Sequence, residues 1–181
     1  MKDSTYMAFA EAIAKESKCI SHKVGCVLVD PEGWVVVHGY NGAPSGQQHC
    51  CDYHTEKFGH IVYVGDKLCT EQRTAHREWS LANEIHAEAN AVAYAARSGR
   101  AVEGSTAYCT LSPCTDCQKL LVAAGVKKVV YKEMYDVNPD GLDFLTRNGI
   151  IVEQYVEPRD YWTERYLKAA TYEGEQNDTV V

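Results

Sequence analysis

The fold of this 181-residue chain is decided by the stretch His86–Cys117, which reads HAEANAVAYAARSGRAVEGSTAYCTLSPCTDC. Its two ends carry a histidine and two cysteines, Cys114 and Cys117, which are residue types that bind zinc. Between them, the periodicity predicts a helix over 86–97 and a strand over 105–111, followed by a helix over 114–124. Helices that alternate with strands are typical of α/β proteins, so we expect this fold to bring the candidate ligands together.

The spacing of these residues favours one shared metal ion. Cys114 and Cys117 are three apart and share a face on one turn of helix. Pro113 fits a helix start, where backbone N–H groups and the helix dipole favour thiolates. His86 and Glu88 are two apart, so both can flank one ion only if the metal lies at the end of their helix. Three protein ligands leave the fourth tetrahedral position to water, which is typical of a catalytic zinc.

Glu88 is the candidate catalytic residue. Two thiolates neutralise the charge of Zn²⁺, so a bound water is acidified less than in an all-histidine site, and a nearby carboxylate is needed to take its proton. A structural zinc site or a C-x-x-C redox pair is the alternative interpretation. A lone C-x-x-C would favour that alternative, but the upstream His-x-Glu favours catalysis.

Composition limits the class of protein. The length fits a single domain over 1–171 with an insertion at about 47–84, and the polar tail 172–181 is expected to be disordered. The net charge of −7 argues against a polynucleotide partner. The absence of a long apolar run or a signal-like N-terminus predicts a soluble, cytoplasmic protein without membrane contact. In that compartment the eight cysteines are expected to be reduced.

The remaining elements complete the expected fold. A helix is predicted over 4–18 with Ser4 or Thr5 as its cap, and the insertion at 47–84 shows no clear periodicity. Other predicted elements are a hairpin of strands Lys23–Val29 and Trp34–Gly39 around a turn at Asp30–Gly33, a strand at 127–132, a helix at 140–148 and a strand at 150–156. This order predicts a three-layer α/β/α sandwich with a mixed central sheet, and ligands at helix N-termini on one sheet edge.

The pattern H-x-E…P-C-x-x-C is the signature of zinc nucleobase deaminases. The chain resembles the cytidine/deoxycytidylate deaminase superfamily from about Ser4 to Val156, and within it the deoxycytidylate (dCMP) deaminases. It is most similar to the phage-type enzymes, which carry a similar insertion before His-Ala-Glu. The resemblance is carried by Ser17–Cys19, Lys23–Gly25, Gly39–Gly46, Asn83–Ala91, Leu111–Cys117 and Tyr135–Asp136.

The resemblance implies a cytidine deaminase-like fold and zinc-dependent hydrolytic deamination of dCMP to dUMP and ammonia. It assigns zinc binding to His86, Cys114 and Cys117, and the proton shuttle to Glu88. By the same resemblance, Asn41 contacts the sugar or base, the Ser112 region accepts a hydrogen bond from the exocyclic amine, and Tyr135 lies near the substrate.

The resemblance also implies a homohexamer that is activated by dCTP and inhibited by dTTP with Mg²⁺. The allosteric nucleotide is then held partly by the loop that contains Tyr40, Gly42, Ala43 and Pro44. Arg97 is either a charge at the C-terminus of its helix or an interface residue that couples the sites, and the sequence leaves both open.

Ser21 and Lys23 are our candidates for binding the 5′-phosphate, because an anion needs local donors and a cation. A lysine at the start of a strand is, however, usually only solvated. The functional alternatives are a deaminase of a free cytosine nucleoside or another aminopyrimidine, and a zinc-stabilised binding module without catalysis.

A second, structural zinc is implied by resemblance to phage-type relatives, with ligands at Cys19, Cys50 and His76. The resemblance does not identify a fourth ligand, for which Glu84 and Cys51 are our candidates. Such a metal would order the weakly patterned insertion. The alternative is that these residues are ordinary buried thiols and surface histidines.

Overall fold

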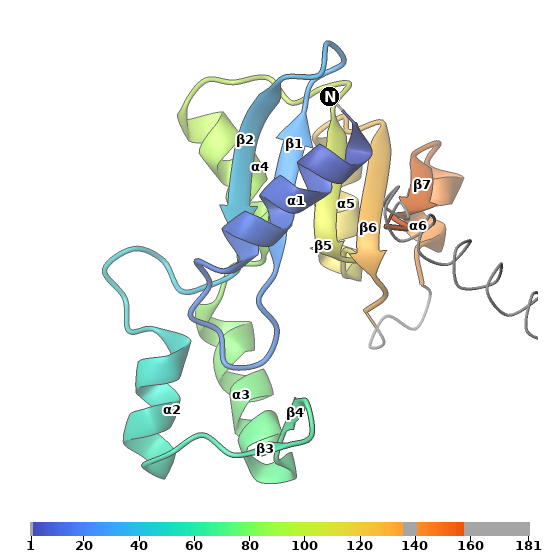
Figure 1. Ribbon diagram of the computed structural model, residues 1–181. Coiled ribbons are helices and arrows are strands. Elements are labelled where there is room, and N and C mark those ends of the chain that lie inside the picture. Colours follow the sequence, from blue (N-terminus) through green and yellow to red (C-terminus); the bar gives the residue numbers. More distant parts are fainter. Residues whose placement is uncertain (1, 136–140, 158–181) are drawn as a thin grey trace, which may run out of the picture.

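The computed structural model describes residues 2–135 and 141–157. A five-stranded mixed sheet with the strand order β2-β1-β5-β6-β7 forms its centre (Figure 1). The elements are α1 (Asp3–Ala14), β1 (Gly25–Val29), β2 (Val35–Tyr40), α2 (Cys50–Phe58), β3 (Tyr63–Val64), β4 (Lys67–Leu68), α3 (Thr70–Asn83), α4 (Ala87–Arg97), β5 (Thr106–Leu111), α5 (Thr115–Ala123), β6 (Lys128–Glu133), α6 (Asp143–Arg147) and β7 (Ile151–Gln154).

The sheet combines an antiparallel hairpin with a parallel half. β1 pairs antiparallel with both β2 and β5, whereas β5, β6 and β7 are parallel. The predicted turn after β1 is present, and the Asp30 carboxylate accepts the Trp34 N–H at 2.7 Å. The helices α5 and α6 connect the parallel strands, so the carboxyl ends of β5 and β6 lie at the same edge of the sheet.

Helices cover both faces of this sheet. On one face, Tyr6, Met7 and Ala10 of α1 pack against β1, β5 and β6. On the other face, α4 and α5 bury a larger apolar cluster that includes Ala91 and Leu121 (Figure 1). The predicted three-layer α/β/α architecture is therefore confirmed.

The start of α1 differs from the prediction. Lys2 is the N-cap, the helix begins at Asp3, and no side chain caps it. The capping role predicted for Ser4 or Thr5 is wrong, because both residues lie inside the first helical turn. Contacts of Tyr6 and Met7 with the sheet place this turn, and those tertiary contacts outweigh a local cap preference.

A close contact between β2 and α4 positions the first turn of α4. A methyl group added at Gly39 would lie 2.4 Å from the Ala87 carbonyl oxygen and 2.5 Å from the Ala91 nitrogen. Only glycine lets the two backbones approach this closely. The Asn90 amide also donates to the Tyr40 carbonyl at 2.8 Å, which ties the end of β2 to the same helix.

The insertion is more regular than its sequence indicates. It contains α2, α3 and the short hairpin β3–β4, and it extends beyond one edge of the central sheet (Figure 1). A small apolar cluster of Cys19, Ile20, Cys50 and Leu68 lies at its base. The Tyr53 ring stacks on Trp79 with centroids 5.2 Å apart, which joins α2 to α3.

The described residues include only part of the segments predicted near the C-terminus. α6 spans Asp143–Arg147 within the predicted helix 140–148, and residue 140 and the tail 172–181 lie outside the described residues. Within the part of the chain that the structure describes, none of the helices is both long enough and apolar enough to span a lipid bilayer.

Candidate metal centre and active site

The candidate ligands meet where two helices begin. His86 is the N-cap of α4 and Cys114 the N-cap of α5, while Cys117 lies in the first turn of α5. The His86 Nδ1 atom is 3.3 Å from the Cys114 Sγ and 3.5 Å from the Cys117 Sγ. Pro113 directly precedes the Cys114 cap and so stands just outside the helix. Each ligand thus comes from a helix terminus whose dipole favours an anion.

The separations of these atoms fit a tetrahedral zinc. With Zn–S near 2.3 Å and Zn–N near 2.05 Å, tetrahedral geometry places nitrogen and sulfur about 3.6 Å apart. The observed 3.3 and 3.5 Å agree with that value, and the three ligand atoms lie within 4.8 Å of one another. The donor set of one imidazole and two thiols is one that zinc prefers.

The cluster is already polarised toward metal binding. Hydrogen bonds from Cys117 and His86 lower the pKa of the Cys114 thiol to about 4. The Cys114 thiolate in turn raises the pKa of His86 to about 9. The pKa of Cys117 is raised, chiefly because its thiol donates to Cys114. These contacts therefore favour the thiolate form of Cys114.

Glu88 stands in the first turn of α4, next to this cluster. Its side chain is only 3% exposed, and burial raises the pKa of its carboxyl group. It also contacts the Cys117 thiol. A buried carboxylate with a raised pKa beside a metal cluster is suited to accept and return a proton.

An open cavity connects Glu88 to the surface. The cavity is lined by Cys19, Ser21, His22, Val24, Asn41, His76, Ser80, Glu84, His86, Ala87, Glu88, Leu111, Ser112, Cys114 and Tyr135. The structure thus brings four of the five predicted substrate residues to one cavity. The fifth, Lys23, lines a neighbouring hollow that shares Ser21 and His22 with it.

Asn41 holds one wall of the cavity in place. Its side-chain oxygen accepts the Val24 N–H at 2.8 Å, and its amide donates to the His22 carbonyl at 2.9 Å. The buried Ser17 hydroxyl donates to the Asn41 carbonyl at 2.8 Å and accepts the Cys19 N–H at 3.2 Å. These bonds fix the loop 17–24 against the end of β2.

Ser112 has a comparable role on the opposite wall. Its hydroxyl accepts the Tyr135 N–H at 2.8 Å and thereby holds Tyr135 at the cavity. The His22 ring meets Tyr135 edge-on, with centroids 6.3 Å apart. Sequence reasoning missed His22 although it lies between two candidates, and it missed Ser80 because the pattern of α3 was not recognised.

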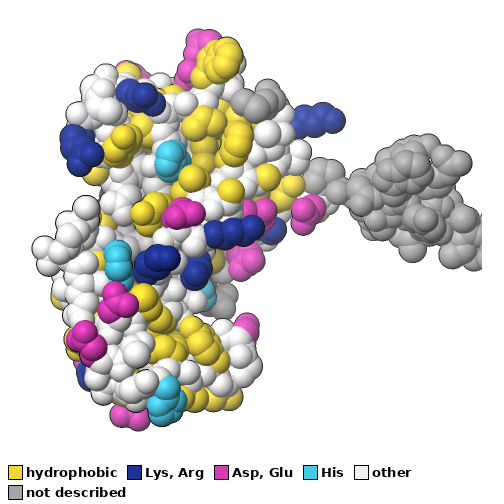
Figure 2. Space-filling model, turned by 60° about the vertical axis from the view of Figure 1, so that its left-hand side comes forward, with side chains coloured by type: hydrophobic (Ala, Val, Ile, Leu, Met, Phe, Trp, Pro, Cys, Tyr) yellow, Lys and Arg dark blue, Asp and Glu magenta, His cyan; other side chains and the backbone are white. Residues whose placement is uncertain are grey.

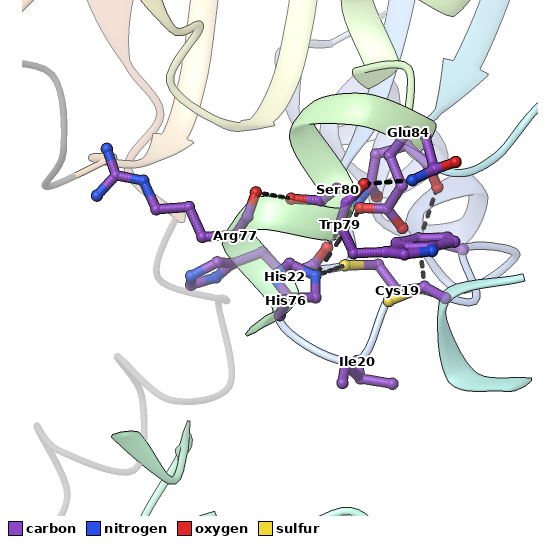
Figure 3. Close-up of polar contacts among 12 residues, drawn as sticks. Cys19, Ile20, His22, His76, Arg77, Trp79, Ser80 and Glu84 are labelled. Carbon is purple, nitrogen blue, oxygen red and sulfur yellow. Dashed lines mark hydrogen bonds and ion pairs between the residues drawn. The ribbon is translucent and has the colours of Figure 1, made fainter. Parts of the chain in front are cut away.

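A second group of metal-binding side chains borders the same cavity. Cys19, Cys50, His76 and Glu84 have ligand atoms within 4.8 Å of one another. The Cys19 Sγ is 3.1 Å from the His76 Nε2, which is 3.8 Å from a Glu84 carboxylate oxygen (Figure 3).

Of the two candidates for the fourth ligand, Glu84 belongs to this second cluster, whereas the Cys51 thiol donates to the Asp52 carboxylate at 3.4 Å. A hydrogen bond from Cys50 lowers the pKa of Cys19 to about 3. Burial raises the pKa of Glu84 to about 7. The cluster is thus a candidate metal site in which the thiolate form of Cys19 is favoured.

The residues considered for allosteric binding lie outside the cavity. Tyr40 is 41% exposed at the end of β2, and Gly42 pairs with Ile85 in an isolated bridge. Arg97 lies in the last turn of α4, and its guanidinium stacks over the Tyr94 ring at 5.3 Å. Helix-end charge and stacking explain the placement of Arg97, and its coupling role stays a prediction.

Comparisons with known proteins agree with this geometry. The family model described as the cytidine and deoxycytidylate deaminase zinc-binding region matches residues 1–133. The deoxycytidylate deaminase of Enterobacteria phage T4 is 45% identical over 82% of this chain and 86% of its own length. The phage T2 enzyme is 42% identical over 90% of this chain and 95% of its own.

A solved structure gives the same result. The dCMP deaminase of cyanophage S-TIM5, in complex with dCMP and dUMP, is 34% identical, with a TM-score of 0.65 over 86% of this chain and 99% of that one. A family match over most of the chain, together with a zinc-compatible cluster beside a buried glutamate, leads to one conclusion. The chain belongs to the cytidine and deoxycytidylate deaminase family.

Proposed function

We propose that this protein hydrolyses dCMP to dUMP and ammonia. The observation that carries the proposal is the position of Glu88, buried at the cavity next to His86, Cys114 and Cys117. The relatives with the greatest identity given above are deoxycytidylate deaminases that align over most of their length, which supports the choice of substrate.

His86, Cys114 and Cys117 would hold the catalytic zinc, which their donor types and separations fit. When bound, zinc supplies a Lewis acid that lowers the pKa of a water molecule. The remaining chemistry belongs to the protein, and above all to a group that can move protons.

Glu88 performs this proton transfer. Its carboxylate takes a proton from the attacking water and delivers it to the ring nitrogen N3 of cytosine as the C4–O bond forms. It then transfers a second proton from the C4 hydroxyl to the amine, the C4–N bond breaks, and ammonia leaves. One carboxyl group thus serves two proton transfers, which is consistent with the upward shift of its pKa on burial.

The cavity wall orients the substrate. Asn41 and Tyr135 would contact the sugar and base, and the Ser112 region would accept a hydrogen bond from the exocyclic amine. Because the Ser112 hydroxyl already holds the Tyr135 N–H, its backbone carbonyl is the more suitable acceptor. Ser21 lies where the cavity meets the hollow that contains Lys23, and these two residues would bind the 5′-phosphate.

The decisive variant is Glu88→Gln. It preserves shape, so zinc should remain bound, while turnover of dCMP should fall by about 10²- to 10⁴-fold, the usual contribution of a general acid–base. Ultraviolet absorbance with dCMP, CMP and deoxycytidine gives the readout. Near-normal turnover in the variant would contradict this mechanism. Equal turnover of deoxycytidine and dCMP by the parent would indicate a nucleoside deaminase, and no turnover by zinc-loaded parent would favour a binding module.

We further propose that Cys19, Cys50, His76 and Glu84 hold a second, structural zinc. Four protein ligands close the coordination sphere, as in structural sites. Metal analysis should find two zinc ions per chain in the parent and one in Cys50→Ser. Cys51→Ser is the matched control and should retain two, because its thiol is directed toward Asp52. One zinc per chain in the parent would rule the second site out.

Regulation and assembly are proposed on the family resemblance and on the exposed surface near α4. The proposal is a homohexamer activated by dCTP and inhibited by dTTP with Mg²⁺, with the regulator held by Tyr40, Gly42, Ala43 and Pro44 and coupled through Arg97. Tyr40, Ile85 and Tyr94 expose apolar surface there, which supports a subunit contact. Sedimentation with and without dCTP and Mg²⁺ tests it, and a monomer with no response to either nucleotide would contradict it.

A further inference from the structure

The cavity beside Glu88 has an unexpected charge balance for a nucleotide. Its lining contains two carboxyl groups, Glu84 and Glu88, and thiols from both clusters. Among the residues that the structure describes, none that lines the cavity is a lysine or an arginine. A nucleoside monophosphate carries about two negative charges at neutral pH, as other phosphate monoesters do. A substrate with that charge therefore needs cations at the cavity rim.

The inserted helix α3 forms one side of that rim. His76 and Ser80 are four residues apart and share a face of α3, and Glu84 is the C-cap of the same helix. All three residues line the cavity. Arg77 directly follows His76 and precedes Ser80 by three residues, which places it at the border of the same face. The Ser80 hydroxyl donates to the Arg77 carbonyl at 3.3 Å.

The side chain of Arg77 is exposed, on the stretch of α3 between the lining residues His76 and Ser80. Figure 3 shows the Arg77 guanidinium and the His22 ring reaching to the same side, away from the contact between Cys19 and His76. His22 and Tyr135 both line the cavity, and their rings meet edge-on. Burial raises the pKa of the Tyr135 phenol, and the positive charge of Arg77 opposes the rise.

The helix that carries Arg77 is firmly held. Trp79 stacks on Tyr53 of α2, and the Gln72 amide binds the chain on both sides, with Nε2 donating to the His60 carbonyl and Oε1 accepting the Val62 N–H. His76 contacts Cys19 from the loop 17–24. The backbone at Arg77 is thus fixed relative to the opposite wall of the cavity.

On this basis we propose that Arg77 binds the 5′-phosphate of the substrate, so that the insertion supplies the group that selects nucleotides over nucleosides. The proposal rests on the deaminase function proposed above and names a residue of the substrate site. Arginine suits the task because its planar guanidinium forms two parallel hydrogen bonds to phosphate oxygens. Lys23 and Ser21, from the loop 17–24, meet the phosphate from the other side.

The test compares Arg77→Ala with Arg73→Ala, using dCMP and deoxycytidine as substrates. Arg73 is also exposed and lies one turn earlier on α3, so it is farther along the helix from the lining residues Ser80 and Glu84. Its removal makes the same change in net charge. We expect Arg77→Ala to lower kcat/KM for dCMP by about ten- to one-hundredfold, the usual range for a hydrogen bond to a charged group. The value for deoxycytidine should stay within twofold, and Arg73→Ala should change neither.

A binding measurement removes the dependence on turnover. Calorimetric titration with dUMP should show weaker binding to Arg77→Ala by the same factor, while deoxyuridine binds both proteins alike. Arg77→Lys should restore only part of the affinity, because an ammonium group lacks the two parallel donors. An unchanged preference for dCMP in Arg77→Ala would refute the role of Arg77 while leaving the deaminase proposal intact. Failure of the parent to deaminate dCMP would instead refute the proposed function.

Discussion

Gly39→Ala tests whether the contact between β2 and α4 sets the geometry of the active site. The added methyl carbon would lie 2.4 Å from the Ala87 carbonyl oxygen, where ordinary contact begins near 3.4 Å. The two backbones must therefore separate by about 1.0 Å (3.4 minus 2.4). The contacted atoms, the Ala87 oxygen and the Ala91 nitrogen, both belong to the backbone, so no side chain can rotate away to make room.

The separation has two expected consequences. Overpacking of this kind costs about 1 to 3 kcal/mol of unfolding free energy. A displacement of about 1 Å at a reacting group lowers the rate by roughly 10²-fold, and the first turn of α4 carries Glu88. We expect Gly39→Ala to show both losses, in urea unfolding and in kcat for dCMP.

Gly42→Ala provides the control for stability. It adds the same methyl group three residues later, where a Cβ atom would meet no other atom within 4 Å. Its unfolding free energy should stay within about 0.5 kcal/mol of the parent value. The reasoning is refuted if Gly39→Ala retains parental kcat and stability, or if both variants are equally destabilised.

Three further predictions concern the support of the site. Tyr108→Phe removes the hydrogen bond from Tyr108 to the Asp3 carboxylate (2.7 Å) and should cost about 1 kcal/mol at pH 7. Burial, and then the hydrogen bond to Asp3, raise the pKa of Tyr108 above its value in the unfolded chain. The parent should therefore lose this stability as the pH rises above 10, whereas the variant should not. Urea unfolding of both proteins at pH 8 and 10.5 measures the difference. Ser17→Ala leaves the Cys19 N–H and the Asn41 carbonyl without their buried partner, and should cost about 1 to 3 kcal/mol and raise KM more than it lowers kcat; a parental KM would contradict this. Removal of metal with a chelator should speed tryptic cleavage at Lys57 and Lys67 in the insertion, which mass spectrometry can follow. Equal cleavage before and after chelation would show that the second cluster does not hold the insertion in place.

The central sheet and the catalytic cluster could be predicted because their signals are local in sequence. The pattern from His86 to Cys117 combines helical and strand periodicity with ligands at both helix starts, and the structure places these ligands within 4.8 Å. The predicted strands and the later helices are present with ends shifted by a few residues. Such shifts are expected where helix and strand ends fray.

The insertion could not be predicted in the same way, because its support comes from distant residues. Gln72 is the buried residue of α3, so the helix presents no apolar stripe to recognise. What holds it is the Tyr53–Trp79 stack and a contact between Cys19 and His76, which are 57 residues apart. The miss at the cap of α1 has the same origin, since contacts of Tyr6 and Met7 with the sheet place that helix start.

The hairpin β3–β4 offers a place where the chain can be lengthened. Its turn at Gly65 and Asp66 is exposed, and neither residue lines the cavity or belongs to either ligand cluster. Exposed turns of this kind accept extra sequence readily. A peptide tag or a fluorescent reporter spliced between these two residues would therefore label the molecule for purification or imaging while the chemistry at Glu88 continues unchanged.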